Sequence, residues 1–153
     1  MKTVIRTSAI ALVLAGFVAV AQAQTGKPVT IVDANTVTAA ELAKLPHITP
    51  DLAKSLLAKR PFKTIKDLDN ALSGLTKEQR TELYGKLFVP INLNTATDEE
   101  ILLIPNVGNR MLREFKEYRP YEALSKFHRE IAKYVDEKEL ARLEQYVSVP
   151  QTK

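Results

Sequence analysis

The feature that most constrains this sequence is an internal repeat. Residues 35–62 align with residues 94–121 without a gap, at an offset of 59. Asn, Thr, Thr, Glu, Pro, Arg and Pro coincide in the two segments, and most other pairs match in polarity. With one inserted residue the match continues, so that Thr76 pairs with Asp136. Because a unit of roughly 60 residues buries only about 60% of its unfolded surface, we expect two units that pack together.

The repeat predicts the domain layout. The first copy spans 33–90 and the second spans 91–149, with a linker at 24–32 and a tail at 150–153. We interpret the remaining segment, 1–23, as a signal peptide.

The N-terminal segment has the three parts of an export signal. A basic start up to Arg6 precedes an apolar stretch from Ser8 to Val20, and Ala21-Gln22-Ala23 forms a cleavage site near Ala23. The apolar stretch is shorter than the roughly 18–20 residues that a spanning helix needs. We therefore expect an exported protein, periplasmic or secreted, with no membrane span in the mature chain.

The charge balance after export is only weakly basic. The full chain has 22 Lys and Arg against 18 Asp and Glu, and loss of Lys2 and Arg6 leaves 20 − 18 = +2. A dedicated nucleic-acid binder has a stronger basic footprint, so any nucleic-acid site depends on local placement of charge.

Each copy reads as four short helices, so the predicted class is all-α. Capping boxes at Thr38–Glu41 and Thr97–Glu100 start helices at 39 and 98. Thr49-Pro50 starts a second helix, which Arg60-Pro61 ends, as Arg119-Pro120 does in the second copy. Third helices are expected over roughly 64–72 and 123–132, and fourth helices after Thr76 and Asp136.

This order of helices and tight turns, together with "INLNTATDEEILLIPNVG" at 91–108, resembles the tandem helix-hairpin-helix domain, most closely the ComEA-type competence and DNA-uptake proteins. The resemblance covers about 31–148. It implies a non-enzymatic protein that binds double-stranded DNA without sequence preference. We expect weak binding, because so few helix N-termini could hold a phosphate. In such proteins the turn reads apolar-x-Gly-apolar-Gly, and free backbone N–H groups of the next helix contact a DNA phosphate.

The four hairpins keep this pattern to different degrees. Ile104–Gly108 keeps the second glycine and is followed by cations, whereas Leu72–Thr76 keeps the first glycine. Leu45–Thr49 is followed by Asp51, which repels phosphate. The expected DNA-phosphate-binding residues are therefore, in the first-ranked hairpin, Asn106, Val107, Gly108, Asn109, Arg110 and Arg113, and, in the second-ranked, Gly74, Thr76 and Lys77.

Two other interpretations stay open. Gly108 could serve only as a helix cap, and the chain could be a structural or protein-interaction module that contacts an exported or envelope protein. The extrinsic helix-hairpin-helix subunit of photosystem II serves in that way. We expect no enzyme and no cofactor, because no nucleophile with an orienting base or phosphate-binding glycine loop is found. The two histidines, His47 and His128, are far apart, so no metal site is expected.

Overall fold

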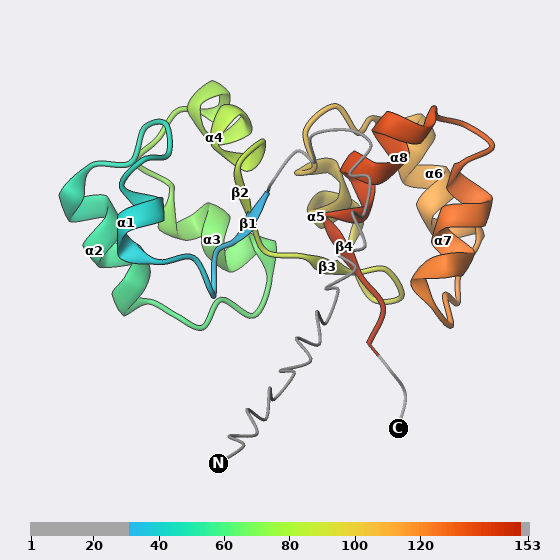
Figure 1. The fold of residues 1–153 in the computed structure, drawn as a ribbon, viewed down its shortest axis with the longest axis horizontal. Coiled ribbons are helices and arrows are strands. Elements are labelled where there is room, and N and C mark those ends of the chain that lie inside the picture. The colour runs from blue at the N-terminus through green and yellow to red at the C-terminus, as the bar shows by residue number, and fades with distance from the viewer. Residues whose placement is uncertain (1–30, 151–153) are drawn as a thin grey trace, which may run out of the picture.

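The computed structural model describes residues 31–150 as a mostly helical chain, which confirms the all-α prediction. Two helical clusters lie side by side, with short strands between them (Figure 1). The expected signal peptide and most of the linker lie outside the described residues. The helices of the first cluster are α1 (Ala39–Leu42), α2 (Pro50–Ala58), α3 (Ile65–Ala71) and α4 (Lys77–Tyr84), and those of the second are α5 (Asp98–Leu102), α6 (Asn109–Glu117), α7 (Leu124–Ile131) and α8 (Glu137–Glu144).

The helices begin where the sequence predicted. The Thr38 and Thr97 side chains cap α1 and α5, and each belongs to a complete capping box. Thr49 caps α2, with Pro50 at the first helical position. These caps satisfy backbone amides locally, so they are readable from sequence alone.

Each cluster also contains one short parallel strand pair that the sequence analysis did not predict. In the first, β1 (Val32–Asp33) pairs with β2 (Leu87–Phe88). In the second, β3 (Ile91–Asn92) pairs with β4 (Val147–Ser148). Each strand has two residues, which is too short to show an alternating pattern. Each pair joins the two ends of one unit and closes it.

An asparagine in each unit holds the chain that follows the second helix. The Asn94 side chain donates to the Tyr121 carbonyl at 2.8 Å and accepts from the Tyr121 amide at 2.6 Å. Asn35 makes the same two contacts with Phe62, at 2.9 and 2.7 Å. Both clamps lie just past a cis X-Pro bond. The shared asparagine of the two copies therefore has a structural explanation.

The single inserted residue of the repeat lies in α7. Elements up to the start of the third helix correspond at an offset of 59, and those after it correspond at 60. The third helix has 7 residues in the first unit and 8 in the second.

The two units meet through aromatic side chains. The Tyr146 hydroxyl donates to the Tyr84 carbonyl at 3.1 Å in a buried contact. The Phe88 and Tyr146 rings pack edge to face at 4.8 Å. Lys66 and Glu99 form an ion pair across the same junction. The buried apolar residues of both units form one continuous core.

We expect Asn94→Ala to lower the free energy of unfolding by about 1–3 kcal/mol, because both backbone groups of Tyr121 lose a partner. Urea denaturation of the variant measures this loss. Thr95→Ala, at an exposed neighbouring position, is the control and should stay within about 0.5 kcal/mol. Equal stability of the two variants would contradict a clamping role for Asn94.

Candidate nucleic-acid interface

The N-terminus of α6 differs from those of the other hairpin helices. Gly108 occupies its N-cap position, so no side chain caps it, and its first turn has no acidic residue. Within residues 31–150, the second helices of the other three hairpins, α2, α4 and α8, each have a side-chain cap and an acid in the first turn. The first turn of a helix leaves backbone N–H groups without intrahelical partners. At α6 the residues that carry these groups, Asn109 and Arg110, are exposed, and no side chain caps the helix end.

The hairpin turn before α6 uses one left-handed residue, and it is not the glycine. Asn106 has φ of 65°, whereas Gly108 is extended at φ −110° and ψ −177°. A side-chain carbon added at Gly108 would meet no atom within 4 Å. The glycine is therefore not required by the backbone conformation, and its effect is to leave the helix end without a side chain.

Exposed cations follow this open helix end. Arg110 and Arg113 lie one turn apart on α6, and both are exposed. Neither forms an ion pair with another residue of the described chain. Asn109 is also exposed and begins the helix. The first two turns of α6 thus carry two exposed guanidinium groups without an ion pair, next to a helix end that no side chain caps. Both features suit a backbone phosphate.

Val107 has a structural position instead. Its side chain is buried, and its amide donates to the Ile104 carbonyl at 3.1 Å. That amide is therefore not available to an anion. Val107 anchors the turn, and the anion-facing part of the hairpin begins at Gly108.

Two backbone amides of the second-ranked hairpin are already bonded to side chains. The Thr76 hydroxyl accepts from the Gln79 amide at 3.3 Å, and the Gln79 side chain accepts from the Thr76 amide at 2.9 Å. Hydrogen bonds from its own backbone amide and from the Thr76 hydroxyl lower the pKa of Glu78, so a carboxylate sits at this helix end. Gly74 is exposed with open space around it. Of this hairpin, the exposed Lys77 is the residue best placed to meet an anion.

The structure brings the two predicted segments to one place. Lys77, from the first unit, and Asn106, from the second, line the same pocket, which has a volume of about 210 Å³. Sequence analysis ranked the two hairpins separately and did not foresee that they adjoin.

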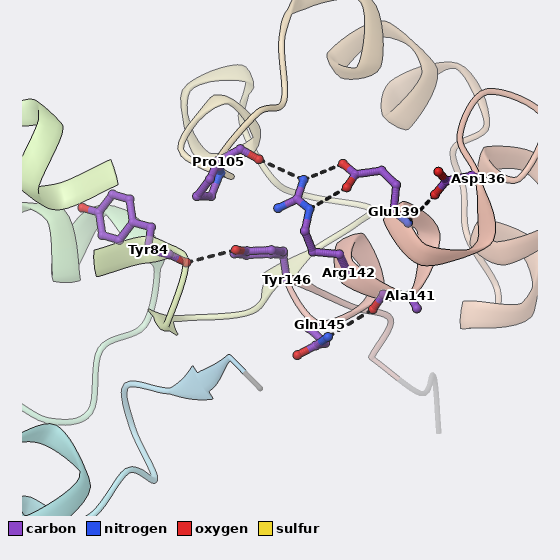
Figure 2. A network of polar contacts seen from close by, with 8 residues as sticks. All are labelled: Tyr84, Pro105, Asp136, Glu139, Ala141, Arg142, Gln145 and Tyr146. Carbon is purple, nitrogen blue, oxygen red and sulfur yellow. Dashed lines mark hydrogen bonds and ion pairs between the residues drawn. The ribbon is translucent and has the colours of Figure 1, made fainter. Parts of the chain in front are cut away.

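A guanidinium that sequence analysis missed holds the Ile104–Gly108 turn in place. Arg142 of α8 donates to the Pro105 carbonyl at 2.9 Å and to the Glu139 carboxylate at 2.6 Å (Figure 2). The hydrogen bonds that Arg142 donates to Glu139 raise the pKa of Arg142. The same guanidinium lies 5.4 Å from the centre of the Tyr146 ring, which is the side chain that contacts the first unit.

Comparing the repeats could have revealed this contact. Arg142 corresponds to Glu82 in the first unit, and Glu82 contacts His47 of the equivalent turn at 2.8 Å. In each unit this position therefore contacts the turn of that unit's first hairpin, but the two side chains have opposite charge. The change from the acidic Glu82 to the basic Arg142 was the sequence signal that could have predicted this contact.

Residues 28–88 match the family model of the helix-hairpin-helix motif. The match covers every described element of the first unit, from β1 to β2, and its description agrees with the fold seen there. No curated protein and no solved structure matched the chain. Within residues 31–150, no helix has the length and apolar character needed to cross a membrane. No group of three or more potential metal ligands gathers in the same part of the chain.

We expect Arg142→Gln to increase hydrogen exchange at the Val107 amide, because the turn loses the bond to its Pro105 carbonyl. Global stability should fall by about 1.5–3 kcal/mol, the usual effect of losing a charged hydrogen bond. Exchange followed by NMR checks the first effect and urea denaturation the second.

Arg129→Gln is the matched control for that variant. Arg129 pairs with Glu130 and its side chain is 66% exposed, so its loss should cost less than about 1 kcal/mol. Unchanged exchange at Val107 in Arg142→Gln would show that the turn holds without the guanidinium.

Proposed function

We propose that this protein binds double-stranded DNA through backbone phosphates, without sequence preference and without catalysis, at the N-terminus of α6. The observation that carries the proposal is the open helix end at Gly108, beside Arg110 and Arg113. Amides and a helix dipole favour an anion there. The helix-hairpin-helix motif of residues 28–88, a motif commonly associated with nucleic-acid binding, supports the same class of ligand.

The finer parts of this proposal rest on sequence. The second unit repeats the element order of the first, so we treat both as copies of the motif. The export signal at 1–23 would place the mature chain outside the cytoplasm, in the periplasm or secreted. A ComEA-type role in uptake or retention of DNA fits that location.

A protein-interaction module is the second candidate function. Three of the four hairpins in the described chain fill their helix ends with their own side chains, as a scaffold that has lost phosphate binding would. In each of these hairpins the first turn of the second helix also carries an acidic residue, which disfavours DNA. The open end of α6 is what sets the DNA proposal ahead.

Fluorescence anisotropy with a random duplex, titrated with salt, tests the DNA proposal on the mature protein (24–153). Binding should be micromolar or weaker at physiological salt, with a log–log slope of about −0.9Z and Z of about 2–4. Arg110→Glu should weaken binding because it places a carboxylate beside the phosphate. Asp51→Lys should strengthen it by removing an acid from the first turn of α2. No binding at low salt, or indifference to Arg110→Glu, would leave the interaction module.

Gly108→Thr separates phosphate binding from helix capping. A threonine here reproduces Thr49, the N-cap of α2, whose hydroxyl accepts from the Leu52 amide at 3.2 Å. Because glycine is itself an acceptable N-cap, stability should change by only a few tenths of a kcal/mol. The hydroxyl would occupy an α6 amide, and DNA binding should fall severalfold.

Gly74→Thr is the control for that substitution, since a side chain there also enters open space. It should leave DNA binding unchanged, because the adjacent helix end is already capped by Thr76. Equal binding by Gly108→Thr and the wild type, at equal stability, would mean that Gly108 serves only as a cap.

A further inference from the structure

A pocket at the junction of the two units has walls of different character. One wall is the segment 102–107, from the end of α5 through the hairpin turn, and it is mainly apolar. The opposite wall comes from α3 and α4 of the first unit and carries polar and charged groups. Those that matter here are Asp69, Lys77, Arg80 and Tyr84.

The acidic group of this pocket is already neutralised from within. Asp69 accepts from the Tyr84 hydroxyl at 2.5 Å, and the Arg80 guanidinium lies 3.3 Å away. Asp69 also contributes to the raised pKa of Tyr84, after burial, so this phenol stays protonated and keeps donating. Lys77 is exposed and forms no ion pair with any other described residue. The pocket therefore presents one available positive charge.

The apolar wall carries one of the most exposed large hydrophobic side chains of the described chain. Leu102 is 41% exposed, and Pro105 lies further along the same wall. A DNA strand alternates charged phosphates with deoxyribose rings, whose carbon faces are apolar. A cation on one wall and an apolar surface on the other therefore complement a strand that runs along the pocket.

We propose that the DNA site is composite: a strand held at the α6 N-terminus continues across the junction, and a neighbouring phosphate meets Lys77. The sugar between them lies against Leu102. This inference rests on the proposed function and extends it, because it makes DNA binding depend on both units. The Leu72–Thr76 hairpin then contributes a side-chain charge, although two of its amides are bonded to side chains.

The junction is held so that the two parts keep their spacing. Tyr146 bonds to the Tyr84 carbonyl, and Tyr84 belongs to the pocket wall. Arg142 packs on Tyr146 and bonds to Pro105 of the opposite wall. Both walls thus connect to one buried tyrosine, as Figure 2 shows.

The contribution of the Lys77 charge is tested by comparing salt titrations of duplex binding for Lys77→Gln and Lys54→Gln. Lys77→Gln should reduce the log–log slope by about 1, because one phosphate contact is lost. Lys54, an exposed lysine on α2, lies on a capped helix away from the pocket and should leave the slope unchanged. Equal slopes for the two variants would overturn the composite site.

The apolar wall has its own matched pair of variants. Leu102→Asp places a carboxylate on the wall and should weaken duplex binding severalfold. Leu124→Asp, at the similarly exposed leucine of α7, should not. Losses of equal size in both would indicate a general charge effect and count against the proposal.

The outcomes distinguish this inference from the proposed function. If Arg110→Glu abolishes binding while Lys77→Gln and Leu102→Asp have no effect, the composite site is wrong and the α6 contact stands. If the wild type does not bind the duplex, both fail. A poly-glutamate peptide serves as the competing probe: if Lys77→Gln weakens its binding while the DNA slope is unchanged, the pocket belongs to an acidic protein partner and the proposal is overturned.

Discussion

The arrangement of the whole molecule depends on how two marginal units are kept together. A unit of about 60 residues has too little interior to be robust alone, so the junction must contribute to both cores. Tyr146 does this from the second unit: its ring packs on Phe88, and its hydroxyl bonds to the Tyr84 carbonyl. The first unit has no equivalent tyrosine, because the residue that corresponds to Tyr146 there is Lys86. The two similar units therefore meet through residues in which they differ.

The two units also differ in the residues that cap the N-termini of their hairpin helices. In the first unit both hairpin helices use threonine as the N-cap, Thr49 and Thr76, whereas α6 has Gly108 at the position of Thr49. A threonine hydroxyl satisfies an amide that would otherwise be open to a ligand. Stability and anion binding thus compete for the same N–H groups, and the single glycine leaves them to a ligand. Arg142 compensates in part by tying the turn to α8.

Much of the fold could be predicted because its signals are local. Thr97 and Glu100 form a capping box within one helical turn, and Pro50 fixes a helix start by its own ring geometry. The strands could not be predicted, because two residues such as Ile91–Asn92 take their conformation from a partner strand far along the chain. The absence of a side-chain cap and of an acid in the first turn of α6 was readable from Gly108 and Arg110. The closeness of Lys77 to Asn106 was not, since it depends on how the two units pack.

The extra residue of α7 has a consequence for how the chain avoids misassembly. Each residue turns an α-helix by about 100°, so an 8-residue helix and a 7-residue helix present the next hairpin in different directions. In a chain made of two similar halves, an element of one half can dock in the other half's place. Because the third helices differ by one residue, α7 in the place of α3 would rotate the start of the following turn by about 100°. The insertion therefore makes the third helices of the two units unequal in length, so that neither is an exact replacement for the other.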